Sequence, residues 1–380
     1  MLVTQVHWSS AGGWSPRSPQ ASCPGANLVL VFGSRALLTS GPVLFDIVQA
    51  YPNAIVAGCS TAGEICGDRV QDDTVVVTAL KWGTSSSEVA SVRLDEAASS
   101  EKAGSLLASR LPRHEALRHV LVFSDGLHVN GSALVQGLTR GLPSHLAITG
   151  GLSADGPSFE DTAVIVGGQA RSRVIVAVGL YGPDLRIGYG SLGGWDVFGP
   201  VRLITRSHGN VLYELDGQSA LALYRRYLGD QARDLPASGL LFPLRVRVRD
   251  SDPGVVRTIL GISDAEDSMT FAGDIPEGAY AQLMRANFDR LVDGAVGAAR
   301  VSAAAIGPES PDCALLISCV GRKMVLQQRV EEEIEGVRDV VGTGTVLAGF
   351  YSYGEISPFT PTARCELHNQ TMTVTTLSER

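Results

Sequence analysis

The chain has 380 residues, 44% of them hydrophobic and 18% charged, which is the composition of a globular protein large enough for more than one core. A net charge of -8 leaves no basic face for a nucleic-acid backbone, so we expect no nucleic-acid partner. The N-terminus lacks the features of a secretion signal, and no run approaches the roughly 20 apolar residues that span a bilayer, so we expect a cytoplasmic protein with no membrane partner.

The first predicted unit occupies the N-terminal part of the chain. The run L-V-L-V-F-G at 28–33 is typical of a strand, and apolar residues between Leu44 and Tyr51 fall on one face of a helix. A second strand leads into A-G-C-S-T-A-G-E-I at 57–65, and V-V-V-T-A-L at 75–80 predicts a third strand. The unit therefore runs strand, helix, strand, glycine-rich turn, strand.

Two further copies of this unit follow. A looser copy contains H-V-L-V-F-S-D-G at 119–126 and A-I-T-G-G-L-S-A-D-G at 147–156. The last copy contains A-L-L-I-S-C-V-G-R at 314–322 and A-G-F-Y-S-Y-G-E-I at 348–356, in the order and spacing of the first. Three unequal copies separated by other sequence favour duplicated domains. We predict an α/β fold of two domains, built from related strand-helix-strand-turn-strand units, with mixed sheets flanked by helices.

The region between the second and third copies has a different pattern. Residues 200–229 predict two strands, a turn and a helix. Alternating apolar residues predict strands at 240–249 and 256–262, and an apolar stripe predicts a long helix from about residue 278 to 301. This inserted sheet and helix predict that the C-terminal domain is the larger one.

Two glutamates in the repeated A-G-x-x-x-x-G-E-I frame point to function. The glycines of the frame are explained by positive φ angles and close backbone approach. The carboxylates of Glu64 and Glu355 need partners if they are buried, and backbone N–H groups of their own turns are one source. In the functional interpretation the two turns face one cavity and bind a small ligand. The candidate ligand-binding residues are Cys59, Ser60, Glu64, Arg322, Tyr351 and Glu355.

The sequence contains no familiar catalytic signature, neither G-x-S-x-G nor a P-loop nor H-E-x-x-H. G-Y-G-S-L-G at 188–193 matches a dinucleotide motif, but Trp195 and Pro200 follow where a phosphate-binding helix would begin. The six cysteines are scattered and form no C-x-x-C pair, which favours buried, reduced thiols. We expect no catalytic activity, and a thiol-dependent enzyme that uses Cys59 or Cys319 stays open as an alternative.

Several motifs, in order along the chain, resemble the FIST proteins. They are G-C-S-T-A-G-E-I near the start, D-G-L-H-V-N-G-S and G-G-L-S-A-D-G in the middle, and S-C-V-G-R, G-F-Y-S-Y-G-E-I and L-H-N-Q-T near the end. The resemblance implies a FIST N domain at 25–190 and a FIST C domain at 191–378, after an N-terminal extension at 1–24. It also implies a sensory, small-ligand-binding module of signal transduction.

A narrower resemblance is carried by N-V-L-Y-E-L-D-G, L-L-F-P-L and M-T-F-A-G-D-I-P-E-G. These segments are similar to stand-alone bacterial FIST proteins that bind b-type haem, sense nitric oxide and act on a partner histidine kinase. The resemblance implies haem b as a cofactor but gives no iron ligand, so His368, His128 and His208 are the alternative candidates. The alternative ligand is an amino acid or a similar polar metabolite held by the two G-E-I turns.

Overall fold

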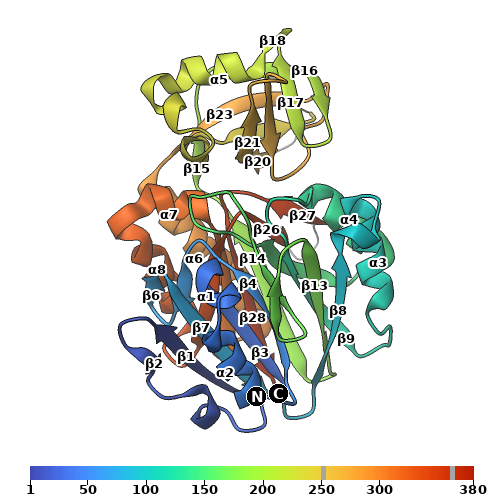
Figure 1. Ribbon diagram of the computed structural model, residues 1–380, viewed down its shortest axis with the longest axis vertical. Helices are drawn as coiled ribbons and strands as arrows, with labels where there is room; N and C mark the ends of the chain where they lie inside the picture. The colour runs from blue at the N-terminus through green and yellow to red at the C-terminus, as the bar shows by residue number, and fades with distance from the viewer. Residues whose placement is uncertain (250–253, 360–363) are drawn as a thin grey trace.

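The computed structural model describes residues 1–249, 254–359 and 364–380, and it contains the three copies that the sequence predicts (Figure 1). Each copy has two parallel strands joined by a helical segment, then a pair of short antiparallel strands, then a strand antiparallel to the first. The first copy comprises β3 (Leu28–Gly33), α1 (Arg35–Thr39), α2 (Pro42–Ala50), β4 (Ile55–Ser60), β5 (Glu64–Cys66), β6 (Arg69–Gln71) and β7 (Thr74–Lys81).

The other two copies repeat this order. The second comprises β9 (Leu117–Ser124), α4 (Gly131–Gly141), β10 (Ala147–Leu152), β11 (Val164–Val166), β12 (Gln169–Arg171) and β13 (Val174–Tyr181). The third comprises β24 (Cys313–Cys319), α7 (Val320–Leu326), α8 (Val330–Val341), β25 (Val346–Ser352), β26 (Gly354–Pro358), β27 (Cys365–His368) and β28 (Met372–Glu379). The predicted α/β class with mixed sheets flanked by helices is confirmed.

The short strand pair of each copy joins the sheet of another copy. β5 of the first copy pairs with β25 of the third, β26 of the third pairs with β10 of the second, and β11 of the second pairs with β4 of the first. An outer strand completes the other side of each sheet: β1 (Leu2–Ser9) beside β7, β8 (Ser86–Arg93) beside β13, and β14 (Leu185–Leu192) beside β28. The three sheets are therefore joined in a cycle.

One phenylalanine from each copy lies in the core that the copies share. The ring centroid of Phe32 lies 4.7 Å from that of Phe350 and 5.6 Å from that of Phe123, and the last two lie 6.2 Å apart. All three side chains are fully buried. Because aromatic side chains bury the most apolar area per residue, this cluster is a major contact between the copies.

The glycines of the repeated frame allow neighbouring strands to approach. A Cβ at Gly58 would lie 1.8 Å from the carbonyl oxygen of Val31, and a Cβ at Gly349 would lie 1.8 Å from that of Leu316. Gly150 has the same place in the looser copy, where a Cβ would lie 1.9 Å from a carbonyl oxygen. No side chain fits at these distances, so the backbone explanation of these glycines is confirmed.

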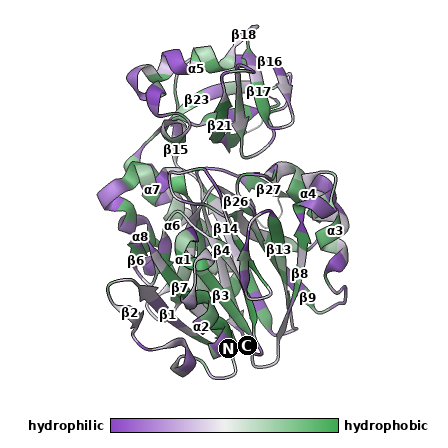
Figure 2. Cartoon of the chain, viewed as in Figure 1, coloured by the Kyte–Doolittle hydropathy of each residue, from purple (hydrophilic) through white to green (hydrophobic). Residues whose placement is uncertain are grey.

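Helices cover the outer faces of the sheets. α3 (Ser100–Arg110) packs against α4, while α6 (Phe288–Ile306) packs on β14 and against α8. Figure 2 shows mostly hydrophobic strands within the body and hydrophilic segments on α5 and α8. Within the described residues, no helix is both long and apolar enough to cross a membrane.

A smaller lobe is inserted between β14 and α6 and lies at the upper end of the molecule in Figure 1. It has a core of its own, in which α5 packs against strands. Its elements are β15 (Trp195–Val197), β16 (Arg202–His208), β17 (Val211–Leu215), β18 (Gln218–Ser219), α5 (Ala220–Leu228), β19 (Leu244–Arg247), β20 (Val255–Arg257), β21 (Ile259–Ser263), β22 (Ser268–Phe271) and β23 (Tyr280–Ala286). The predicted inserted sheet and the helix before Gly229 are confirmed.

The long helix predicted from residue 278 is wrong at its start. Residues 280–286 form β23, which pairs with β19, β15 and β16, and α6 begins only at Phe288. The side chain of Asn287 caps this helix by accepting a hydrogen bond from the backbone N–H of Arg290. Apolar spacing alone fits either element here, whereas the Asn cap marks the boundary.

The predicted domain ranges stay predictions. Strands from both sides of residue 190 share sheets, since β5 pairs with β25 and β10 pairs with β26. β1, within the predicted extension at 1–24, pairs along its whole length with β7.

We expect Phe350→Ala to lower the free energy of unfolding by about 3–5 kcal/mol, because it removes the ring that packs against Phe32 and Phe123 of the other copies and leaves a cavity. Phe45→Ala is the control, since Phe45 is 63% exposed and its loss should cost less than about 0.5 kcal/mol. Urea unfolding of both variants measures the difference. Equal losses would contradict the central role of the cluster.

Candidate functional site

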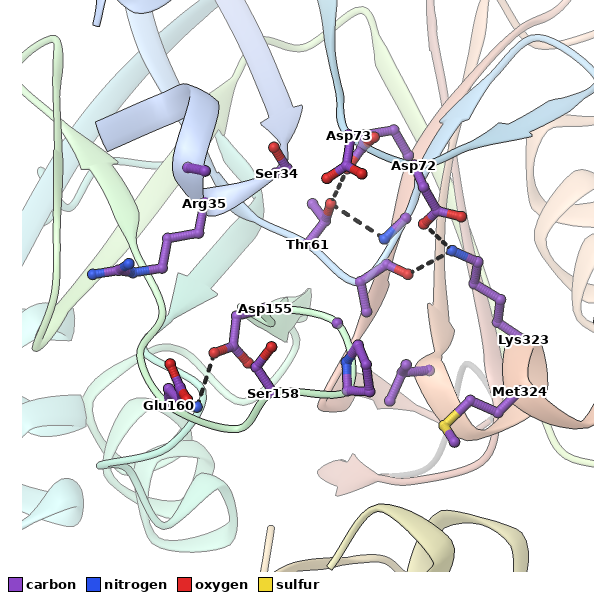
Figure 3. A pocket seen from close by; sticks show the side chains of 17 residues that line it. Ser34, Arg35, Thr61, Asp72, Asp73, Asp155, Ser158, Glu160, Lys323 and Met324 are labelled. Carbon is purple, nitrogen blue, oxygen red and sulfur yellow. Dashed lines mark hydrogen bonds and ion pairs between the residues drawn. The ribbon is translucent and has the colours of Figure 1, made fainter. Parts of the chain in front are cut away.

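A cavity of about 700 Å³ lies where turns of the first two copies meet a helix of the third (Figure 3). The first copy supplies the segment after β3 and the turns between β4 and β5 and between β6 and β7; the second supplies the loop after β10, and the third supplies α7. We call this the three-copy cavity. Its lining consists of residues 34–36, 61–64, 72–73, 155–158, 160, 320, 323 and 324.

Acidic side chains predominate in the lining. The carboxylates belong to Glu64, Asp72, Asp73, Asp155 and Glu160, and the cations belong to Arg35 and Lys323. The Lys323 ammonium donates to the carbonyl oxygen of Ala62 at 2.9 Å and forms an ion pair with Asp72. Figure 3 shows Arg35 and Lys323 on opposite sides of the cavity.

Arg35 also has a carboxylate partner, because its guanidinium forms an ion pair with Asp161. Its buried Nε, in contrast, has no hydrogen-bond partner. Among the described residues, the carboxylates of Asp73 and Glu160 form no ion pair. The cavity therefore offers two unpaired carboxylates.

Asp155 orders the loop that the second copy contributes. Its carboxylate accepts hydrogen bonds from the backbone N–H groups of Phe159 at 3.0 Å, Glu160 at 2.9 Å and Asp161 at 3.0 Å. It also accepts one from the hydroxyl of Tyr353, which belongs to the third copy. This part of the wall is thus held by a contact between copies.

Glu64 is buried beside the cavity within a network of hydroxyl groups. Its carboxylate accepts hydrogen bonds from the Thr61 hydroxyl, from the Thr74 hydroxyl at 2.6 Å and from the Thr74 backbone N–H at 3.1 Å. Burial raises the pKa of Glu64 to about 7, while the three donors act in the opposite direction. The protonated form of the carboxyl is therefore far more populated near neutral pH than that of an exposed glutamate.

Glu355 has the same surroundings but does not line the three-copy cavity. Its carboxylate accepts from the Ser352 hydroxyl at 2.6 Å, the Thr371 hydroxyl at 2.9 Å and the Thr371 backbone N–H at 3.2 Å. Burial raises its pKa to about 8. The two G-E-I turns therefore share a network, but only the first contributes to the cavity.

The second copy has an apolar pair in place of this network. One residue begins the short strand pair in each copy: Glu64 lies opposite Gln71, Glu355 lies opposite His368, and Val164 lies opposite Arg171. Val174 begins β13 where Thr74 begins β7, and both valines are buried. In the second copy, valines thus stand in place of both the glutamate and the threonine. This joint replacement indicates that the network has a structural role, which is to hold the turn against the next strand.

Arg322 and Tyr351 belong to a different, fully buried network. The Arg322 guanidinium donates to the Glu333 carboxylate at 2.7 and 3.0 Å, and the Tyr351 hydroxyl donates to the same carboxylate at 2.7 Å. Arg322 also donates to the carbonyl oxygens of Leu291 and Gly193, at 2.6 and 3.1 Å. Breaking a buried pair of this kind costs more than forming it gains, so these residues hold α7 and α8 in place.

Cys59 and Ser60 lie in the core at the end of β4. The Ser60 hydroxyl accepts a hydrogen bond from the Ala163 backbone N–H at 2.9 Å, which joins the first copy to the second. Burial raises the pKa of the Cys59 and Cys319 thiols well above the usual range. Thiolate formation, which thiol catalysis requires, is disfavoured at both positions.

The three histidine candidates lie apart from the three-copy cavity. His368 is buried, with its Nε2 2.7 Å from the carbonyl oxygen of Ser357, and burial lowers its pKa to about 4. His128 is held by Asp125, whose carboxylate lies 3.1 Å from its Nδ1, and His208 is exposed. None of the three lines either large cavity formed by the described residues.

The positions of these histidines bear on whether either cavity can bind haem. A haem site needs an axial ligand that faces a cavity, and the imidazoles do not supply one. The described residues also contain no group of three or more histidine, cysteine, aspartate or glutamate side chains suited to a metal ion. The three candidate histidines therefore do not place haem at either cavity.

Lys323, Asp73 and Asp155 line the cavity but are not among the site residues that the sequence predicted, although the sequence contains signals for them. Lys323 follows Arg322 directly, and one helical step of about 100° turns Arg322 into the core and Lys323 toward the cavity. Asp73 has a φ of 53° in the turn after β6, and Asp155 lies in S-A-D-G after β10. Acidic residues in the turns that follow β6 and β10 are the pattern that points to them.

Family models account for most of the chain. A FIST N domain matches residues 27–218, and a FIST C domain matches residues 220–358. The chain belongs to the FIST family. FIST domains are sensory, ligand-binding domains of signalling proteins, so a small-molecule ligand and a signalling partner follow from membership.

Comparison with individual proteins adds little to this FIST assignment. No curated protein matches the chain significantly. A cyanuric acid hydrolase from A. caulinodans is 9% identical, with 100% of this chain and 99% of that chain covered, at a TM-score of 0.39. A second cyanuric acid hydrolase, described as an evolutionary innovation by structural concatenation, is 8% identical with the same coverage and a TM-score of 0.32. Likeness at this level carries no functional conclusion.

The raised pKa values of Glu64 and Glu355 predict a stability that falls as pH rises. Unfolded glutamates ionise near pH 4.5, whereas the folded ones hold their protons to about pH 7 and pH 8, so the folded state binds more protons within this window. Glu64→Gln with Glu355→Gln should flatten the decline between pH 5 and 7 by up to about 1.4 kcal/mol per pH unit per carboxyl.

Urea unfolding at several pH values measures this slope. Glu335→Gln is the control, because Glu335 is exposed on α8 and the slope should stay that of the unmodified protein. If the double variant also keeps that slope, the two buried carboxyls are ionised in the folded state.

Proposed function

We propose that the protein is a non-catalytic sensor whose three-copy cavity binds a small metabolite with an ammonium group, such as an amino acid. The observation that carries the proposal is the convergence of segments from all three copies, including α7 of the third, on one acidic cavity of about 700 Å³. A ligand there contacts every copy at once. Its binding energy is thus available to shift the copies relative to one another, which is what a sensor requires.

The unpaired groups of the cavity set the ligand's chemistry. Asp73 and Glu160 are carboxylates without an ion pair among the described residues, so an ammonium group gains charge-assisted hydrogen bonds there. The Arg35 side chain is 40% exposed, so its guanidinium can donate to a ligand carboxylate beside its ion pair with Asp161. An amino acid has both groups, whereas a simple anion would meet an excess of negative charge.

Transmission of the signal begins with Lys323. Its ammonium bridges Asp72 and the Ala62 carbonyl oxygen of the first copy, while its backbone lies in α7 of the third copy. A ligand ammonium that competes for Asp72 releases this bridge and biases the position of α7. We propose that a partner histidine kinase, the partner implied by the family resemblance, recognises the resulting surface.

Amino-acid binding is tested by calorimetry with the common amino acids and with putrescine as an amine without a carboxylate. Asp73→Asn and Glu160→Gln should each weaken binding at least tenfold, because each removes a charged acceptor worth about 1.5–3 kcal/mol. Both residues are exposed, so folding should be unaffected. No binding at millimolar concentration, or unchanged affinity in both variants, would exclude the proposal.

A matched pair of variants separates ligand contact from structural damage. Glu64→Gln and Glu355→Gln alter the same hydroxyl network, but only Glu64 lines the cavity. We expect Glu64→Gln to change the affinity and Glu355→Gln to leave it within about twofold, well below one charged hydrogen bond. An equal loss in both variants would indicate a general effect on the fold.

An absorption spectrum distinguishes the predicted haem and nitric oxide sensor from the amino-acid sensor proposed here. Because no candidate imidazole faces a large cavity of the described residues, we expect no Soret band beyond that of free haem after reconstitution. A shifted Soret band that responds to nitric oxide in the ferrous form, and that is lost in His368→Ala, would instead favour the haem sensor.

A further inference from the structure

A second cavity, of about 590 Å³, lies between the body and the lobe. α4 of the body contributes Ser132 and Gln136 to its lining, and β19 and β20 of the lobe contribute Val246 and Val255. We call it the lobe cavity. It has no residue in common with the three-copy cavity, so what it binds is independent of the function proposed above.

Arg257, the last residue of β20, is a buried cation in this lining. Its side chain reaches from the lobe into the body, and the residue is only 6% exposed. The guanidinium donates to the carbonyl oxygens of Asp274 and Leu367, both at 3.0 Å. It also donates to the carbonyl oxygen of Val256 and to the hydroxyl oxygen of Ser132, both at 3.2 Å. All four acceptors are uncharged.

The positive charge of Arg257 thus has no ion-pair partner among the described residues. Burial lowers its pKa to about 10, with the more distant charges of Asp274 and Glu366 acting in the opposite direction. The Asp274 carboxylate is itself engaged, since it accepts a hydrogen bond from the Asn130 amide at 2.6 Å. A buried cation with only neutral partners is costly, and an anion bound beside it recovers part of that cost.

The rest of the lining is divided between apolar and polar side chains. One part is an apolar wall of Val135, Val246, Val255, Pro276 and Leu367. The other part carries charges of both signs, on Arg140, Arg364, Asp274 and Glu366. An apolar wall in the same cavity as a buried charge is typical of sites for amphipathic small molecules, in which the charge fixes orientation and the wall supplies affinity.

We propose that the lobe cavity binds an organic anion, a carboxylate with an apolar body, which places its carboxylate at Arg257 and its apolar body against the valines of β19 and β20. The ligand contacts the lobe and the body together. Their existing contact uses the same residues, because the Ser132 hydroxyl accepts from Asp274 N–H at 3.1 Å and from Arg257. Occupancy therefore fixes the lobe on the body.

Calorimetry with octanoate tests the site, with acetate and octanamide as probes of the two halves of the ligand. Octanoate should bind, and both acetate and octanamide should bind at least about tenfold more weakly, because one lacks the apolar body and the other the charge. Octanoate that does not bind at millimolar concentration, or octanamide that binds as tightly, would overturn the proposal.

Gln136 allows a test that does not endanger folding, since it is exposed on α4 and lines the cavity. Gln136→Lys should tighten octanoate binding and Gln136→Glu should weaken it, each by about fivefold from Coulomb interaction across the cavity. Gln231→Glu, the same charge change at an exposed lobe residue outside the lining, should have no effect. Equal affinities in the two Gln136 variants would place octanoate elsewhere.

Discussion

The exchange of short strand pairs between copies is the constraint on which the rest of the structure depends. Each buried strand end needs hydrogen-bond partners for its backbone, and those partners come from another copy: β5 meets β25, β26 meets β10, and β11 meets β4. A copy taken alone would expose an unpaired strand edge. The three copies therefore fold as one body, and the turns that line the three-copy cavity are fixed by contacts that span most of the sequence.

Buried polar groups then position these turns individually. Glu64 and Glu355 each tie a turn to the beginning of the following strand, and the second copy replaces the same contact with two valines. Arg322 and Glu333 do similar work for the helices of the third copy. Each charged group is satisfied within the fold, so none of these residues needs a ligand to explain it. The carboxylates without an ion pair in the three-copy cavity are those of Asp73 and Glu160, both exposed, among the described residues.

The lobe is a second structural unit of this FIST protein, with its own core beside the body of three copies. It is inserted between β14 and α6, which both contact β28 of the third copy, and Arg257 and Asp274 join it to Ser132 on α4 of the second copy. A change in the position of the third copy therefore reaches the lobe through its covalent connections. Apolar contacts also join the lobe to the body, since Leu240, Leu260 and Ala272 lie in the same buried cluster as residues of the body.

The sequence by itself determined the repeated units, the glycine positions and the family, because strand periodicity, helix stripes and turn residues are local and recur in each copy. It also marked Glu64 and Glu355 as carboxylates that would need partners if they were buried. Only the tertiary structure decided that one of them lines a cavity, that Arg322 and Tyr351 serve a buried network, and that residues 280–286 form a strand. These outcomes depend on which copy receives each strand pair, and pairing between strands hundreds of residues apart leaves no local pattern to read.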